Sequence, residues 1–251
     1  MLRKRIIFVL TFLDGVLFRT RNFKPDYRYT HNFVDSWSVD EIIILDISRS
    51  KQSSRKIFLN RVKSIARDCF VPLTVGGGIR TVEDIEMFLR SGADKVVLNS
   101  GALENPDLIN EAVNIFGSQC ITISIDSKLE NGEYYVYKNH CAESTSLKLL
   151  PWINEVQLRG VGEVLIQNYQ KDGTLEGYDW QQIKLAREKT SVPLIACSGA
   201  GNWAHFERAL NLKVDGVATT NIYHFTETAI NSAKSYLLSK GHRMREIFNE
   251  R

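Results

Sequence analysis

Several features that would mark a secreted, membrane-spanning or nucleic-acid-binding protein are missing from this sequence. Its four cysteines, at positions 69, 120, 141 and 197, have no paired spacing, so we expect free thiols in a reducing cytoplasm rather than disulfides or a metal site. No apolar run is long enough to cross a membrane. The 32 basic and 29 acidic residues are dispersed and leave a net charge of only +3, which gives no nucleic-acid footprint. We therefore expect a cytoplasmic protein without metal, cofactor, nucleic-acid or membrane partners.

Linkers are also absent, and this bears on the number of domains. Only five prolines occur, and no proline- or serine-rich stretch separates the two halves of the chain. The 251 residues suit one (β/α)8 barrel, which typically needs about 250. The basic start resembles a signal peptide, but Thr11 and Asp14 interrupt the apolar run and no small-residue cleavage site follows. We therefore interpret residues 5–10 as a buried strand in a single domain that covers residues 1–251.

The most informative stretch is residues 71–100, V-P-L-T-V-G-G-G-I-R-T-V-E-D-I-E-M-F-L-R-S-G-A-D-K-V-V-L-N-S. An apolar strand at 71–75 runs into three glycines. Thr81 is placed to cap a helix that Gly92 ends, and a second strand at 95–98 follows. A strand, a glycine loop and a helix N-terminus in this order hold phosphate on backbone N–H groups at the C-terminal edge of a parallel sheet.

The same unit occurs a second time in the chain. The separation is 121 residues in every matching pair, which are Val71 and Val192, Pro72 and Pro193, Leu73 and Leu194, Gly78 and Gly199, Asp94 and Asp215, and Val96 and Val217. This separation is close to half of the chain, so it indicates a duplicated half-fold. The sequence therefore predicts an α/β fold, a (β/α)8 TIM barrel made of two half-barrels, with two phosphate sites on one face.

Alternating apolar and amphipathic segments complete the pattern of a barrel. We expect strands at 5–10, 41–47, 71–75, 95–98, 120–125, 163–168, 193–197 and 216–220. We expect helices at 32–38, 56–68, 82–91, 106–116, 147–158, 180–189, from 203 onward, and at 226–240. Residues 11–33 are predicted to form a long functional loop. Asn131-Gly132 predicts a hairpin turn that pairs the region of Lys128 with residues 134–137 over the barrel mouth.

At these residues the chain resembles the cyclase subunit of imidazole glycerol phosphate synthase, the HisF family, almost from end to end. The matching strings are Arg5-Ile6-Ile7, Asp14-Gly15, Pro72-Leu73-Thr74-Val75-Gly76-Gly77-Gly78-Ile79-Arg80, Gly92-Ala93-Asp94-Lys95-Val96, Phe116-Gly117-Ser118-Gln119-Cys120-Ile121, Ile125-Asp126, Asp172-Gly173-Thr174, Gly177-Tyr178-Asp179 and Gly199-Ala200-Gly201. A triple glycine alone would be a weak signal, whereas the whole set is highly specific.

The resemblance implies a barrel that takes ammonia from a docked glutaminase and passes it along its axis to a bisphosphorylated substrate. Two strand-end aspartates would carry the acid–base chemistry of ring closure and lyase cleavage, and Asp126 and Asp172 are the candidates present here. The residues expected to bind substrate and phosphate are Gly77, Gly78, Asn99 and Ser100 at one site, Ser198, Gly199, Thr220 and Asn221 at the other, and also Arg19 and Gly173.

Departures from the family pattern gather on this catalytic face. The family's first catalytic aspartate falls on Thr11, a lysine of the following loop falls on Arg19, and a phosphate-loop glycine falls on Ser198. Small hydroxyl residues of the sixth strand fall on Gln167 and Asn168. A threonine hydroxyl cannot exchange a proton near neutral pH as a carboxyl group can, so cyclase activity is expected to be reduced or absent.

Charged residues begin four strands at the opposite end of the barrel. They are Arg5, Glu41, Lys95 and Glu163, and in the family these positions form the ammonia gate. Two acids and two bases that point inward would make a closed charged ring. The alternative is four solvated strand-start charges of little energetic value. We expect a HisH-like glutaminase subunit to dock on this face, with Asp94 at its rim.

Three functional classes remain open. The first is an authentic cyclase that performs the lyase and cyclase step of histidine biosynthesis. The second, favoured here because of Thr11, is a diverged relative that delivers ammonia for amidation of a sugar in surface glycan or lipopolysaccharide synthesis, with a sugar amidotransferase as a further partner. The third is a non-catalytic scaffold, which the presence of Asp126 and Asp172 disfavours. A phosphorylated small molecule is the expected substrate.

Overall fold

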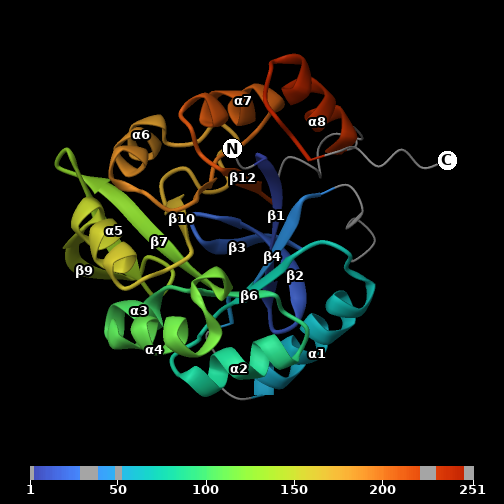
Figure 1. Cartoon of the computed structure of the whole chain (residues 1–251), viewed down its shortest axis with the longest axis vertical. Helices are drawn as coiled ribbons and strands as arrows, with labels where there is room; N and C mark the ends of the chain where they lie inside the picture. Colours follow the sequence, from blue (N-terminus) through green and yellow to red (C-terminus); the bar gives the residue numbers. More distant parts are fainter. Residues whose placement is uncertain (1–2, 29–38, 49–52, 221–229, 246–251) are drawn as a thin grey trace.

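Eight parallel strands form a closed barrel, and the helices lie around its outside (Figure 1). The computed structural model describes residues 3–28, 39–48, 53–220 and 230–245. The barrel strands are β1 (Arg5–Leu13), β4 (Glu41–Asp46), β5 (Leu73–Gly76), β6 (Lys95–Leu98), β7 (Ile121–Glu130), β10 (Glu163–Asn168), β11 (Leu194–Cys197) and β12 (Gly216–Thr219). Each pairs in parallel with its neighbours, and the β12–β1 pair closes the ring. The predicted α/β barrel is confirmed.

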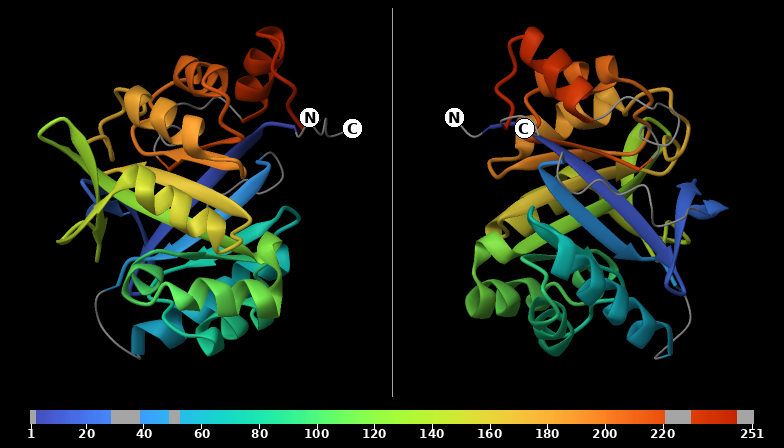
Figure 2. Two further views of the ribbon diagram at one scale, coloured as in Figure 1. Left: turned by 60° about the vertical axis from the view of Figure 1, so that its left-hand side comes forward. Right: turned by 90° about the vertical axis from the view of Figure 1, so that its right-hand side faces the viewer.

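A layer of helices encloses the barrel, and further views show it on both sides (Figure 2). The helices are α1 (Ser53–Asp68), α2 (Val82–Arg90), α3 (Ser100–Glu104), α4 (Asp107–Phe116), α5 (Leu149–Leu158), α6 (Trp180–Lys189), α7 (Trp203–Asn211) and α8 (Ile230–Ser239). As predicted, Thr81 caps α2, in a capping box with Asp84, and Asn202 caps α7. The predicted helix at 32–38 and the start of the predicted last helix lie outside the described residues. Within the described ranges, no helix is both long and apolar enough to cross a membrane.

The alternation of side chains along each strand divides the apolar core into two parts. On β1, Ile6, Phe8 and Leu10 face the helices and belong to the large outer core. Ile7 and Val9 face the barrel axis and belong to a smaller inner core, which also contains residues 43, 97, 165, 195 and 218. The inner core fills the middle of the barrel, so polar side chains of the same inward-facing set are left at its two ends.

The predicted duplication is visible in the hydrogen bonds. The Asp94 carboxylate accepts a hydrogen bond from the Leu73 N–H (2.8 Å), and 121 residues later the Asp215 carboxylate accepts one from the Leu194 N–H (3.1 Å). The backbone N–H of each aspartate in turn donates to the carbonyl of the same leucine. The start of β6 is therefore held against β5 in the same way as the start of β12 is held against β11, as expected for two related half-barrels.

The prediction of a long loop over residues 11–33 is wrong for its described part. Strand β1 continues to Leu13, and an antiparallel hairpin follows, formed by β2 (Val16–Arg21) and β3 (Lys24–Arg28). Asp14 and Gly15 make the turn between β1 and β2 with φ of 49° and 77°, as in the two-residue turns that suit twisted hairpins. Residues 29–33 lie outside the described residues.

The second hairpin agrees with its prediction and is larger than expected. Asn131 and Gly132 form the turn with φ of 49° and 84°, and β8 (Glu133–Lys138) pairs with the extended end of β7. A further strand, β9 (Glu143–Lys148), pairs with β8 and was not predicted. Because β9 takes residues 147 and 148, helix α5 starts at Leu149. The β8–β9 turn lies beside the barrel mouth and takes part in the site described next.

Candidate functional site

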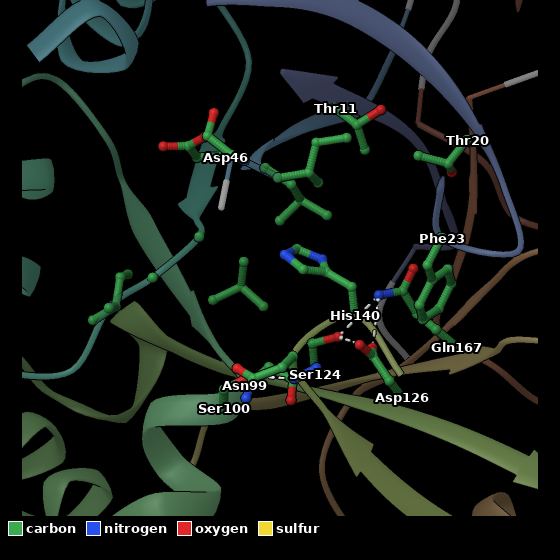
Figure 3. A pocket seen from close by; sticks show the side chains of 18 of the residues that line it. Thr11, Thr20, Phe23, Asp46, Asn99, Ser100, Ser124, Asp126, His140 and Gln167 are labelled. Carbon is green, nitrogen blue, oxygen red and sulfur yellow. Dashed lines mark hydrogen bonds between the residues drawn. The ribbon is translucent and has the colours of Figure 1, made fainter. Parts of the chain in front are cut away.

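A cavity of about 490 Å³ lies at the C-terminal ends of the barrel strands. Figure 3 shows its lining, which combines inward-facing strand residues with loop residues. Among the predicted site residues, those that line it are Thr11, Gly77, Gly78, Asn99, Ser100, Asp126, Asp172 and Thr220. Arg19, Gly173, Ser198 and Gly199 are not among its lining residues, and Asn221 lies outside the described part of the chain. The described residues contain no group of three or more histidine, cysteine, aspartate or glutamate side chains suited to a metal ion.

Asp126 is the carboxyl group best placed for acid–base chemistry. It ends the inward-facing row of β7 and is 6% exposed. Its carboxylate accepts hydrogen bonds from the Gln167 amide (3.1 Å) and the Ser124 hydroxyl (3.3 Å). Burial raises the pKa of Asp126 to about 7, although these donors favour the charged form. A carboxyl group with a pKa near neutrality can both accept and release a proton at physiological pH.

Asp172 lies in the loop after β10 and also lines the cavity. Burial raises the pKa of this carboxyl group, and hydrogen bonds from the Phe23 N–H and the Thr20 hydroxyl act against the rise. The contact with the Phe23 N–H is 2.9 Å long. The carboxylate therefore joins the β2–β3 turn to the loop after β10, which is a structural contact with a distant segment and not a cap within its own turn. Its role in acid–base chemistry stays a prediction.

Thr11 occupies the inward-facing position at the mouth end of β1. It is 6% exposed, and its hydroxyl donates a hydrogen bond to the Phe18 carbonyl of β2. The antiparallel pairing of Thr11 with Phe18 fixes this contact. The hydroxyl proton is thus held by the backbone, and the group cannot ionise near neutral pH. Strand β1 supplies no carboxyl group to the cavity at this position.

The backbone of the first glycine loop packs closely against a neighbouring segment. Gly77 has φ of 115°, and a Cβ atom there would lie 2.3 Å from the Asp46 carbonyl oxygen. The Arg55 guanidinium binds the Gly77 carbonyl (2.6 Å) and the Asp84 carboxylate (2.6 Å). Arg55 comes from α1 and was not singled out from the sequence, because no local motif marks it. It fixes the carbonyl side of a loop whose glycines line the cavity.

The second glycine loop has Cys197 and Ser198 at the positions of Gly76 and Gly77 in the first. Ser198 corresponds to Gly77 in the repeat, and it adopts φ of 77°, a region that glycine favours. Gly199 has φ of 99°, and its Cβ would lie 2.3 Å from the Gly177 carbonyl oxygen. The Gly201 N–H donates to Nδ1 of His205 (3.0 Å). This loop keeps the backbone shape of its counterpart while carrying a side chain at position 198.

Two predicted substrate-binding residues lie away from the cavity. Arg19 forms an ion pair with Asp26 across the β2–β3 hairpin. Its neighbour Thr20 lines the cavity, and successive strand residues face opposite sides. Gly173 has φ of 73°, and a Cβ there would lie 2.6 Å from the Thr20 carbonyl oxygen. Gly173 allows the loop after β10 to approach the hairpin closely, and substrate binding by Arg19 and Gly173 stays a prediction.

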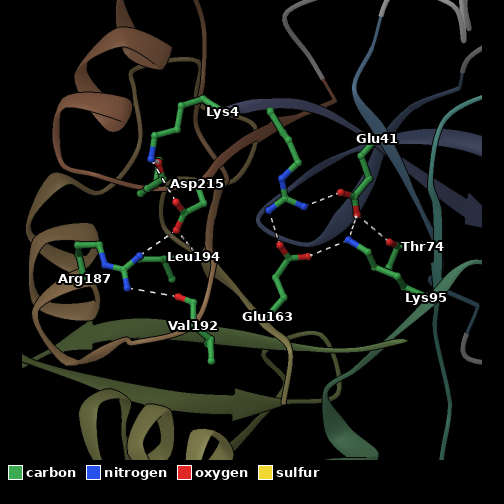
Figure 4. Close-up of polar contacts among 11 residues, drawn as sticks. Lys4, Glu41, Thr74, Lys95, Glu163, Arg187, Val192, Leu194 and Asp215 are labelled. Atoms are coloured by element: carbon green, nitrogen blue, oxygen red, sulfur yellow. Dashed lines mark hydrogen bonds and ion pairs between the residues drawn. The ribbon is translucent and has the colours of Figure 1, made fainter. Parts of the chain in front are cut away.

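The four charged residues at the opposite end form the closed ring that the sequence suggested (Figure 4). The Arg5 guanidinium binds Glu41 (2.7 Å) and Glu163, and the Lys95 ammonium binds Glu41 (3.1 Å) and Glu163 (3.4 Å). Glu41 and Glu163 are 1% and 5% exposed. Burial by itself would lower the pKa of Arg5, but the two carboxylates outweigh burial and raise it. The alternative of four solvated charges is therefore wrong.

The ring, the inner core and the cavity are parts of the same inward-facing rows. On β1 the row is Arg5, Ile7, Val9 and Thr11, and on β10 it is Glu163, Leu165 and Gln167. The ring therefore lies at one end of the barrel axis and the cavity at the other, with apolar side chains between them. Asp94, at the rim of the ring end, is exposed and holds the Leu73 N–H.

Comparison with known proteins shows which family and which relatives match this chain. A family described as histidine biosynthesis protein matches residues 9–229. A relative from an Exiguobacterium species, named imidazole glycerol phosphate synthase subunit HisF, is 40% identical over 252 residues, which cover 98% of each chain. A relative of the same name from Dictyoglomus turgidum is 42% identical over 80% of each chain. Another, from a Thermotoga species, is 36% identical, and the match covers 96% of this chain and 97% of the relative. None of these names refers to sugar amidation, so that prediction gains no support from them.

Proposed function

Because the chain belongs to the HisF family, we propose that it is the ammonia-using subunit of an imidazole glycerol phosphate synthase. In this proposal, ammonia enters through the charged ring and reacts at the barrel mouth with a bisphosphorylated substrate, in a lyase and cyclase step. The observation that carries the proposal is Asp126, a buried carboxyl group with a pKa of about 7 in a cavity that shares its barrel axis with the ring.

The cavity supplies the binding groups that such a substrate needs. Gly77 and Gly78 precede helix α2, and Asn99 and Ser100 follow β6 at the start of α3, so this corner would bind one phosphate group. Thr220, at the related position of the second half, lines the same cavity and would belong to the second phosphate corner. Asp126 lies between strands of the two halves, where it would exchange protons with the substrate.

A glutaminase partner is proposed for the N-terminal end of the barrel. Besides the ring and Asp94, this end exposes apolar side chains where two helices finish: Phe70, just after α1, is 65% exposed, and Leu158, the last residue of α5, is 78% exposed. Exposed apolar groups beside charged ones are typical of protein interfaces. A subunit docked here would release ammonia directly over the ring.

Amidation of a sugar remains a second candidate, and Thr11 is the observation that favours it. With a hydroxyl group bound to the Phe18 carbonyl at this position, strand β1 lacks the carboxyl group that the family's cyclase reaction uses. In this candidate the barrel delivers ammonia, a sugar amidotransferase completes the reaction, and no ring closure occurs.

Turnover with free ammonia separates the two candidates. The purified chain and its Thr11→Asp variant would be supplied with an ammonium salt and the bisphosphorylated aminoimidazole-type substrate. We expect the unmutated chain to turn over slowly, and Thr11→Asp to be faster by up to about 10²–10⁴-fold, the usual worth of an acid–base group. Turnover by the variant alone would favour sugar amidation. Inactivity of both would contradict the cyclase proposal and point to Gln167 and Asn168 as further causes.

A further inference from the structure

The turn between β8 and β9 has an unusual backbone. Asn139, His140 and Cys141 have φ of 53°, 55° and 59°. Positive φ is uncommon for residues other than glycine, and three in succession require support from their surroundings. This turn belongs to the hairpin insertion beside the barrel mouth, and His140 is its central residue.

Contacts on both sides of His140 hold this backbone in place. The Asn139 N–H donates to the hydroxyl of Ser100 (3.0 Å), a residue of the first phosphate corner. The Lys128 ammonium donates to the Cys141 carbonyl (2.9 Å) and lies over the rings of Tyr137 and Tyr169, 4.0 and 4.4 Å from their centroids. Residues 139 and 141 are thus fixed to two different parts of the barrel mouth, which fixes the direction of the side chain between them.

The side chain of His140 points into the cavity. Figure 3 shows its imidazole ring extending into the space that the labelled residues surround, with Asp126 and Thr11 on the same lining. His140 is half-buried, and it comes from a loop rather than from the barrel strands that carry Asp126 and Thr11. Backbone strain is often found where a functional side chain has to be aimed.

The acid–base chemistry of the proposed function needs more than one proton-transfer group. Thr11 cannot ionise near neutral pH. The Asp172 carboxylate accepts a hydrogen bond from the Phe23 N–H, so it is already engaged in a structural contact. Imidazole is the side chain that ordinarily exchanges protons near neutrality. We propose that His140 contacts the substrate and acts with Asp126 as the second proton-transfer group of this cavity, and that it carries the slow turnover expected of a chain with Thr11 in place of a carboxyl group. This inference rests on the proposed function and deepens it.

The proton balance is simple. The Asp126 carboxylate accepts a proton from one atom of the substrate, while the protonated imidazole of His140 donates a proton to the atom that leaves. Water then takes the proton from Asp126 and another proton reprotonates His140, so the site returns to its starting state. The charged and titratable groups that share the cavity lining with His140 are Asp46, Arg80, Asp126, Glu143, Asp172 and Cys197, and Lys128 contacts the carbonyl of the next residue in its loop.

The test compares His140→Asn with the unmutated chain. Asparagine tolerates left-handed backbone better than most residues, so this variant removes the imidazole with little change of the turn, which thermal unfolding would verify. Ser144→Ala is the matched control, because Ser144 lies in the same insertion, is exposed and does not line the cavity. With free ammonia, we expect kcat of His140→Asn to fall about 10²–10⁴-fold with KM changed only a few-fold. The pH–rate profile of the variant should no longer show the ionisation of one of the two proton-transfer groups, so that one side of the bell-shaped curve is lost.

Nuclear magnetic resonance of histidine labelled with ¹³C provides a readout that does not need turnover. The chain has five histidines. The signal that is missing from the spectrum of His140→Asn is the signal of His140. The bisphosphorylated substrate, added without ammonia, should move this signal and its titration midpoint. A shifted signal without turnover would contradict the proposed reaction and leave His140 as a substrate contact. An unmoved signal, or full activity of His140→Asn in an active enzyme, would overturn the inference about His140.

Discussion

At the scale of single residues, the site depends on how far a few polar groups are removed from water. Asp126 is buried, and among the described residues its side-chain hydrogen-bond donors are the neutral groups of Ser124, Gln167 and Asn99. Such donors offset part of the cost of burying a charge, whereas a cationic partner would offset more of it. The carboxyl group is therefore left with a pKa of about 7, which makes it useful for proton exchange and costly for folding once it is charged.

This cost predicts how stability depends on pH. The pKa of Asp126 lies above its ordinary value of 3.8 in the folded state, so folding favours the protonated form, and the stabilisation is lost as the pH rises from about 4 through 7. Asp126→Asn cannot ionise. We expect its free energy of unfolding to increase relative to the unmutated chain over this range, by on the order of a few kcal/mol.

Urea denaturation at a series of pH values would measure this difference. Glu111→Gln, a change at an exposed glutamate of α4, serves as the control and should follow the unmutated chain. Parallel curves for Asp126→Asn and the unmutated chain would show that the carboxyl group is already ionised at low pH and that its assignment as an acid–base group is wrong.

At the scale of elements, the alternation of side chains along strands explains what the sequence could predict. Once residues 5–10 and 163–168 are assigned as strands, Arg5 and Glu163 lie at strand starts where their side chains can point inward, so the pattern allowed the ring that the structure shows. The β7–β8 turn was found because Asn131-Gly132 is a strong hairpin turn signal. Asp14-Gly15 is the same kind of turn signal, but the many charged residues that follow made the β2–β3 hairpin look like a loop.

The direction of His140 shows where sequence reasoning ended. It depends on three successive left-handed residues and on contacts with Ser100 and Lys128, which lie 40 and 12 positions away in the sequence. The same holds for Arg55, which reaches the first glycine loop from α1. Contacts between distant segments select these positions, and no local pattern of residue types signals them.

The second glycine loop supports a prediction at this scale. Ser198 adopts φ of 77° at a position where the first loop has Gly77. A Cβ atom in left-handed backbone costs about 1–2 kcal/mol, and the greater freedom of glycine in the unfolded chain offsets part of this. Ser198→Gly should therefore raise the free energy of unfolding by about 0.5–1 kcal/mol.

Thermal and urea unfolding would measure this gain, with Ser91→Gly as the matched control. Ser91 ends α2 with φ of −85° and donates a hydrogen bond to the Met87 carbonyl, so glycine there should destabilise the protein. Equal destabilisation by both changes would mean that the Ser198 side chain contributes more through its contacts than its backbone costs.

At the scale of the whole molecule, the duplicated barrel separates two kinds of chemistry along one axis. The ring of Arg5, Glu41, Lys95 and Glu163 lies at one end and the cavity with Asp126 at the other. Both ends use the same inward-facing rows, and the apolar inner core between them excludes bulk water. This arrangement suits the transfer of a small neutral molecule such as ammonia, which loses far less than an ion when it leaves water.

Docking of a glutaminase at the ring end predicts a role for Asp94 that can be separated from its structural one. Its exposed carboxylate also accepts a hydrogen bond from the Leu73 N–H (2.8 Å). Two substitutions are therefore needed to separate the docking role from this structural one. Asp94→Asn keeps an oxygen that can accept this hydrogen bond, whereas Asp94→Lys removes it and reverses the charge. We expect Asp94→Lys to weaken binding of the glutaminase subunit at least about tenfold, a loss of about 1.4 kcal/mol, and Asp94→Asn to have a smaller effect.

Titration of the barrel with the glutaminase subunit, followed by calorimetry and by the rate of glutamine hydrolysis, would measure the loss. Activity with free ammonia should stay unchanged in both variants, because the cavity lies at the opposite end of the axis. If Asp94→Lys instead binds the partner normally while its free energy of unfolding falls, the carboxylate serves only to join β6 to β5, as Asp215 joins β12 to β11. The docking face would then have to be sought away from Asp94.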